Sequence, residues 1–234
     1  ADIDHLFFSH HHYDHDSDFG TFLMTRWDHI VPEDRPLNIY GPRATQEFTE
    51  ETVEVFRHDW TARINHVGSQ DVYSARGGKL PRKRPQVRVA EIGPGAQVEG
   101  KGWTVTAAHA QHVAPWLDSL AYRVDSDGKS VVLTGDTAPC PEVTDLARGA
   151  DILMMMCWDL HDMLQGSEPA RGSASVRGCA ETAASAGVRQ LVMVHVGPGL
   201  RSGPALEKRE KEAASSFHGS IIWGEELMEI PWPD

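Results

Sequence analysis

Short apolar runs alternate along the chain with longer stretches of helical character. Runs of four to seven residues at 3–9, 37–40, 103–108, 130–134, 152–156, 191–194 and 220–223 read as strands. Between them the pattern predicts helices near residues 43–57, 141–148, 174–187 and 204–216, and Gly187 is a good stop for the third. No internal repeat is present. The alternation predicts an α/β fold in one domain spanning residues 1–234.

Residues 66–88 interrupt this alternation, because glycines and prolines punctuate a polar sequence there. The stretch is the one cationic patch of the chain, and its basic residues are Arg76, Lys79, Arg82, Lys83, Arg84 and Arg88. We expect an exposed loop or inserted arm whose charges are solvated. The alternative is an anion-binding arm that grips a phosphodiester.

Composition narrows the classes of function. The chain has 234 residues, 40% of them apolar, and 34 acidic residues against 22 basic ones give a net charge of −12. This balance argues against a broad nucleic-acid-binding face, so a nucleic acid is a permitted but not a favoured partner. Three cysteines without a C-x-x-C spacing favour a reducing compartment, and we expect a cytoplasmic protein. No apolar window is long enough to span a membrane.

Side chains that can bind a metal are most closely spaced at residues 10–15, where His10, His12, Asp14 and His15 form the pattern H-x-H-x-D-H. Imidazole and carboxylate groups at this density are typical ligands of zinc, iron or manganese. A histidine-rich solvated loop or an expression tag is the alternative. The apolar strand before the motif, and the Tyr and Asp within it, argue against a tag. The pattern therefore predicts a metal site at the end of the first strand.

Three later residues could complete such a site. His112 follows the strand at 103–108, Asp136 follows the strand at 130–134, and His195 follows the strand at 191–194. Each is a metal-capable side chain just beyond the carboxyl end of a strand, where open α/β sheets form their binding crevices. A lone histidine at a strand end is more often structural, but three such positions beside the opening motif favour the metal hypothesis.

Together these motifs resemble the metallo-β-lactamase-fold hydrolase superfamily, in particular its ribonuclease Z and arylsulfatase-like branch. The resemblance covers residues 3–200 and is carried by residues 10–15, 39–42, 121–123, 134–137, 150–151, His112 and His195. It implies a four-layer αββα sandwich with a dinuclear site. It would assign one metal to His10, His12 and His112, the other to Asp14, His15 and His195, and a bridging role to Asp136. His109 competes with His112, which we prefer because the branch places its histidine directly before a short Pro-containing loop.

The chain departs from the branch in two places. Family members carry strands ahead of H-x-H-x-D-H, whereas only nine residues precede His10 here. We therefore expect a sandwich lacking its first strands; either the sequence continues before Ala1 or another chain covers the exposed face. Secondly, Met155 and Met156 stand where ribonuclease Z has a His-Glu pair, and Ser173 stands where it has a further histidine. Processing of tRNA by that route is therefore not expected.

Nearby polar residues, Asp159, His161 and Asp162, could supply a substitute acid, although ordinary loop polarity is the favoured explanation for them. Trp and Met side chains around them could line a substrate wall or simply belong to the core.

The resemblance implies a hydrolase that uses a metal-bridging hydroxide, with Asp14 and Asp136 as its catalytic carboxylates. A phosphodiester or related small ester is the favoured substrate. Alternatives are a β-lactam or lactone hydrolase on the same fold, or a metal-binding protein without hydrolytic activity. Zinc is the favoured metal for both positions, with manganese or iron as alternatives. We expect a homodimer that does not contact membranes.

Overall fold

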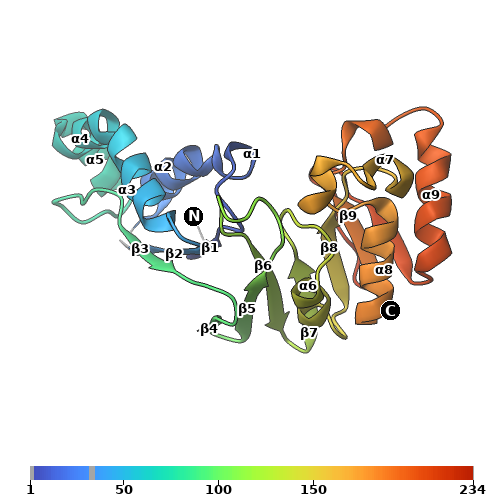
Figure 1. The fold of residues 1–234 in the computed structure, drawn as a ribbon. Coiled ribbons are helices and arrows are strands. Elements are labelled where there is room, and N and C mark those ends of the chain that lie inside the picture. The colour runs from blue at the N-terminus through green and yellow to red at the C-terminus, as the bar shows by residue number, and fades with distance from the viewer. Residues whose placement is uncertain (1–2, 32–34, 234) are drawn as a thin grey trace. The chain divides into compact units, whose positions relative to one another are not determined.

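The computed structural model describes residues 3–31 and 35–233. The chain divides into two compact units, Ala1–Ile92 and Gly93–Asp234, and each contains its own β-sheet and helices (Figure 1). The mixed α/β character predicted from the sequence is confirmed in both. None of the helices in the described ranges combines the length and apolar character needed to cross a bilayer.

The first unit is built on a parallel three-stranded sheet in the order β1-β2-β3. Its strands are β1 (His5–Phe7), β2 (Leu37–Gly41) and β3 (Val87–Glu91). Its helices are α1 (Tyr13–Asp16), α2 (Phe19–His29), α3 (Thr45–Val55), α4 (Arg57–Asn65) and α5 (Val67–Ala75). Leu37 and Ile39 alternate along β2 and are fully buried, as expected for one face of a strand. Phe8 and Phe19 pack edge to face beside them at 5.1 Å.

The second unit contains a seven-stranded sheet in the order β10-β9-β8-β7-β6-β5-β4. Strands β4 (Gln97–Gly100), β5 (Trp103–His109), β6 (Leu120–Ser126) and β7 (Lys129–Leu133) pair antiparallel. Strands β7, β8 (Ile152–Met156), β9 (Gln190–Val194) and β10 (Ser220–Trp223) pair parallel. The helices are α6 (Pro141–Leu146), α7 (His161–Leu164), α8 (Val176–Ala186) and α9 (Ala205–Ser216), with single 3₁₀ turns at Glu168–Arg171 and Pro198–Leu200.

Helix α8 shows how this unit forms its core. The hydroxyl of Ser175 accepts a hydrogen bond from the Gly178 amide at 3.0 Å and caps the start of the helix, and Gly187 at φ 68° ends it. The buried face of α8 consists of small residues, so the helix packs closely against β8 and β9, where Leu153 and Leu191 are fully buried. This packing supports the end of β9, which His195 follows directly.

The three cysteines are buried thiols of the second unit, and none of them forms a disulfide. Cys179 donates to the Met156 carbonyl oxygen at 3.2 Å, and burial raises the pKa of its thiol well above the usual value. These thiols are core residues rather than nucleophiles or metal ligands.

The prediction for residues 66–88 is wrong in two respects. Helix α5 occupies residues 67–75, where a loop was expected. Arg82 is not solvated but buried, with its guanidinium stacked 3.9 Å above the Trp27 ring and 4.6 Å from the Tyr73 ring. Aromatic partners that are distant in sequence thus turn one residue of the cationic patch into a core residue. The apolar pattern of the sequence also did not predict α1, α2, α4, α7, β3, β4 and β6.

Candidate metal centre

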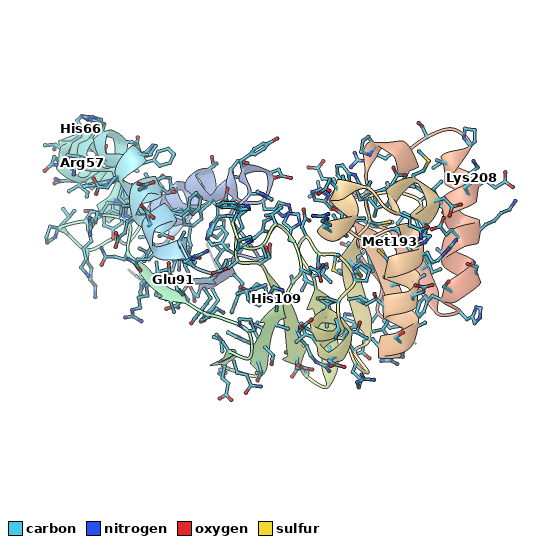
Figure 2. The ribbon with its side chains drawn as sticks, in the orientation of Figure 1. Arg57, His66, Glu91, His109, Met193 and Lys208 are labelled. Atoms are coloured by element: carbon cyan, nitrogen blue, oxygen red, sulfur yellow. The ribbon has the colours of Figure 1, made fainter. Side chains whose placement is uncertain are left out.

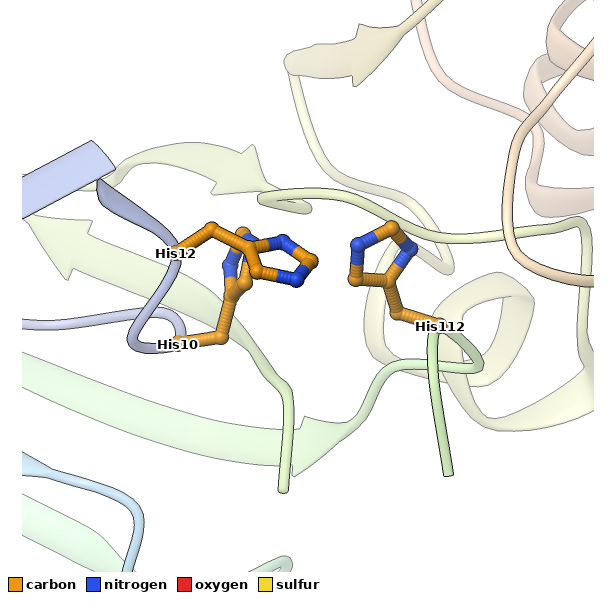
Figure 3. Close-up of side chains that lie close together, drawn as sticks. All are labelled: His10, His12 and His112. Carbon is orange, nitrogen blue, oxygen red and sulfur yellow. The ribbon is translucent and has the colours of Figure 1, made fainter. Parts of the chain in front are cut away.

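In the first unit, the chain leaves β1 and runs directly into the histidine motif. The Phe8 amide still donates to the Tyr40 carbonyl oxygen at 2.8 Å, so strand pairing holds the backbone up to the first ligand position. His10 is fully buried, and its Nε2 lies 3.0 Å from Nδ1 of His12 (Figure 3). Ser9 Oγ contacts the other ring nitrogen, Nδ1 of His10, at 3.1 Å. One ring nitrogen of His10 therefore points toward one ring nitrogen of His12.

The one-turn helix α1 presents the other half of the motif. His15 lies on it with its ring centroid 4.3 Å from that of His10. Its Nε2 lies 3.6 Å from an oxygen of Asp14. The structure thus gathers His10, His12, Asp14 and His15 within the first unit, as the spacing predicted.

His11, between the two facing histidines, has a different role. Its Nδ1 lies 3.1 Å from the Asp16 carboxylate and its Nε2 lies 2.8 Å from the Thr45 hydroxyl. Both partners are buried. Because His11 is bound on both nitrogens to its own unit, it anchors the motif to α3 and is not available as a ligand.

In the second unit, Asp136 is the centre of a separate cluster. It lies in the turn after β7, is buried, and one of its oxygens, Oδ2, is 3.8 Å from Nε2 of His112 and 3.8 Å from Nε2 of His195. His112 follows β5, and His195 follows β9. All three residues predicted from strand ends are therefore brought together around one carboxylate oxygen.

The local backbone orients both imidazoles. Nδ1 of His112 donates to the Gly172 carbonyl oxygen at 2.7 Å, which leaves Nε2 with its lone pair on the side of Asp136 (His112 is labelled in Figure 3). His195 adopts φ 47°, in the left-handed region that few residues other than glycine enter. Strain of this kind is concentrated at binding and catalytic sites.

These donor sets fit divalent metal ions. At 3.8 Å, the contacts of Asp136 with the two imidazoles are too long for hydrogen bonds. Two ligands bound at about 2.1 Å to one ion are separated by roughly 3–4 Å, so the spacing suits a shared cation. A buried carboxylate flanked by neutral imidazoles is the ligand chemistry of zinc and related metals.

The other predicted residues have mainly structural contacts. His109, labelled in Figure 2, is the last residue of β5 and pairs in register with Leu120. Met155 and Met156 are buried core residues of β8. Asp159 accepts from the Leu160 amide at 2.8 Å, and His161 lies 3.4 Å from the Ser175 hydroxyl. These loop contacts favour ordinary loop polarity for Asp159 and His161.

Comparison of the sequence with known proteins gives a consistent result. Residues 1–196 match the family described as beta-lactamase superfamily domain. A ribonuclease Z of Mycobacterium bovis (strain BCG / Pasteur 1173P2) is 33% identical over 237 residues, covering 98% of this chain and 80% of the relative. A putative ribonuclease Z of Mycobacterium tuberculosis (strain CDC 1551 / Oshkosh) is also 33% identical, covering 96% of this chain and 97% of the relative.

Solved structures with low sequence identity show the same fold. The short form of human tRNase Z superposes with a TM-score of 0.67 at 18% identity, covering 99% of this chain and 80% of that one. The metallo-beta-lactamase fold protein YhfI from Bacillus subtilis gives a TM-score of 0.67 at 18% identity, covering 95% of this chain and 75% of that one. The fold and the recognised motifs agree, and the chain belongs to the beta-lactamase superfamily, as a hydrolase of its ribonuclease Z branch.

Proposed function

We propose that the protein is a dinuclear metal-dependent hydrolase of phosphodiesters or closely related esters. The observation that carries the proposal is the buried Asp136 carboxylate, with two oriented imidazoles at 3.8 Å from the same oxygen. The first unit contributes a second set of candidate ligands, on the segment that follows β1 and on α1. The proposed ligand set is His10, His12, Asp14, His15, His112, Asp136 and His195.

Each of these residues has a defined task in the proposal. His10, His12 and His112 would hold one ion, and Asp14, His15 and His195 would hold the other. Asp136 would be a ligand to both and, with Asp14, would supply negative charge to the site. Gly172 holds the His112 ring in the tautomer that binds through Nε2. Once bound, divalent ions lower the pKa of water towards neutrality and polarise a substrate oxygen.

The names of the relatives favour a phosphodiester over a β-lactam or lactone, since they include ribonuclease Z and tRNase Z. The position of Met155 and Met156 inside the core of β8 favours a different proton donor from the His-Glu pair of ribonuclease Z. We therefore propose a small phosphodiester as the preferred substrate, with RNA as the alternative. Zinc is the proposed metal, with manganese or iron as alternatives, and a cytoplasmic homodimer remains a prediction.

The experiment is a substrate panel measured before and after chelation. Bis(4-nitrophenyl) phosphate, a precursor tRNA, a chromogenic β-lactam and a lactone are offered to protein purified without chelator. We expect turnover of the phosphodiester, loss of that turnover after dialysis against chelator, and recovery on adding zinc or manganese. Turnover of the lactone or β-lactam alone would contradict the proposed substrate class, and chelator-resistant turnover would contradict the metal mechanism.

The choice between His112 and His109 as a ligand gives a paired prediction. His112→Ala should lower metal content by up to one ion per chain and reduce turnover more than about 100-fold, because it removes a ligand rather than an outer-shell partner. His109→Ala should leave metal content nearly unchanged, and it serves as the matched control three residues away. Elemental analysis of metal per chain in both variants tests this choice. Loss of metal from His109→Ala but not from His112→Ala would show that His109 is the ligand.

A further inference from the structure

A pocket of about 260 Å³ lies wholly within the first unit, among residues of α2, α4, α5 and the segment that follows α5. None of the proposed metal ligands lines it. Its polar lining comes from Asp28, Arg63, His66, Ser69, Arg76 and Arg82. Three guanidinium groups around a pocket are unusual in a chain with a net charge of −12.

One carboxylate neutralises only part of this charge. Nη2 of Arg82 donates to Asp28 at 2.9 Å, whereas Arg63 and Arg76 lie 3.5 and 3.9 Å from the same carboxylate. Burial opposes ionisation of Asp28, but the Arg82 hydrogen bond and the charges of Arg63, Arg82 and Arg76 outweigh it and lower the pKa of the carboxyl group. The pocket therefore holds an ionised Asp28 and an excess of positive charge.

Arg82 forms the rigid base of the pocket. Its side chain is 4% exposed and is fixed between the Trp27 and Tyr73 rings. Its Nε is buried and has no hydrogen-bond acceptor within the described part of the chain. A buried donor without an acceptor is destabilising, and an oxyanion is the kind of acceptor that it lacks.

Arg63 and Arg76 form a more accessible rim, with side chains 44% and 37% exposed. Their contacts with Asp28 are ion pairs rather than hydrogen bonds at these distances, so most of their N–H groups are not used by Asp28. Among the described residues, the Asp59 carboxylate lies closer to Arg63 than Asp28 does and accepts from its Nε at 2.9 Å.

The beginning of helix α5 adds a further attraction for anions. His66 caps this nine-residue helix by accepting from the Ser69 amide at 3.3 Å, and both residues line the pocket. The amino end of a helix carries a partial positive charge and attracts phosphate groups. Figure 2 labels His66 at this position and Arg57 on the neighbouring helix α4.

We propose that this pocket is a phosphate-binding site separate from the metal centre. Arginine is the residue best suited to bind phosphate oxygens in pairs, and Arg63, Arg76 and Arg82 provide such donors around one small cavity. Its volume lies below the range typical of pockets for drug-sized ligands and is large enough for a phosphate group. The phosphate belongs either to a free phosphate ion or to the backbone of an oligonucleotide.

The test is a ¹⁵N NMR titration of the full chain with inorganic phosphate, and separately with a short single-stranded oligoribonucleotide, at constant ionic strength. Saturable shifts of the Gly68 and Ser69 amide signals are expected in at least one titration. In the variants Arg63→Gln and Arg76→Gln the dissociation constant should rise at least about tenfold, as for loss of a charge-assisted hydrogen bond. Arg57→Gln is the matched control on α4, because Arg57 pairs with Glu54 and does not line the pocket.

The two titrations distinguish the sources of the phosphate. Binding of inorganic phosphate at least as tight as that of the oligonucleotide assigns the site to the free ion, and tighter oligonucleotide binding assigns it to a nucleic-acid backbone. The proposal is overturned if neither ligand shifts these amides saturably, or if Arg63→Gln and Arg76→Gln bind as well as Arg57→Gln. Because the signals report on α5 alone, phosphate bound at the metal centre does not affect this conclusion.

Discussion

Asp136→Ala should abolish hydrolysis and lower the metal content of the purified protein. Asp136 is buried, and its Oδ2 lies 3.8 Å from Nε2 of both His112 and His195, so its removal takes away the carboxylate that these two imidazoles share. In the proposed centre it binds both ions, and its loss should exceed the roughly 10–100-fold effect of losing an outer-shell partner. We expect turnover of a phosphodiester to fall more than about 100-fold, measured beside elemental analysis of metal per chain.

A surface carboxylate provides the control for this substitution. Asp145 is exposed and its carboxylate pairs with Arg148, just beyond the end of α6, so Asp145→Ala should retain full activity and metal content. Thermal unfolding of both variants separates loss of the site from loss of the fold. Asp136→Ala protein that is folded, keeps two ions and turns over substrate would show that Asp136 is not a ligand.

The central parallel strands of the second unit could be predicted because their burial is nearly continuous. The run at 152–156 coincides with β8 and the run at 191–194 lies within β9. Parallel strands covered on both faces read as unbroken apolar sequence, which identifies them without an alignment. The carboxyl ends of β5, β7 and β9 then placed His112, Asp136 and His195 at candidate positions, and the structure confirms that they form a cluster within this unit.

Other elements depend on contacts that sequence pattern does not encode. Helix α5 lies within a stretch punctuated by Gly68, Gly77 and Gly78, and such punctuation predicts a loop. Arg82 resembles a surface residue in sequence, but Trp27 and Tyr73 enclose it, and Trp27 is 55 residues away. Packing between distant residues overrode local preference in both cases.

Three adjacent histidines of the motif also show that contacts in the fold cannot be predicted from sequence pattern alone. His10, His11 and His12 are identical in type and adjacent in sequence, so spacing alone cannot exclude the middle one. Only the positions of Asp16 and of Thr45, the latter 34 residues away, show that His11 is a structural anchor. The family pattern H-x-H-x-D-H leaves out the middle histidine, and the partners that hold this histidine, Asp16 and Thr45, lie outside the run of three histidines.

Among substitutions that add a single methyl group to the loop after β9, Gly197→Ala should disturb the position of His195 most. A Cβ at Gly197 would lie 1.8 Å from the Trp158 carbonyl oxygen, and the Gly197 amide also donates to the Cys157 carbonyl oxygen at 3.0 Å. The loop after β9 must therefore move away from the chain that leaves β8. Overpacking costs about 1–3 kcal/mol, and each kcal/mol lowers the melting temperature by roughly 2–4 °C at this chain length.

Gly199→Ala is the matched control two residues further along the same loop. Its Cβ would lie 3.5 Å from the Asp159 carboxylate, an ordinary contact with a side chain that can adjust. We expect Gly199→Ala to keep its melting temperature and metal content, and Gly197→Ala to lose both stability and up to one ion per chain. His195 already adopts a strained backbone two residues before Gly197, so displacement of the loop should reach its imidazole directly. Equal metal content in the two variants would show that the close contact with Trp158 does not position His195.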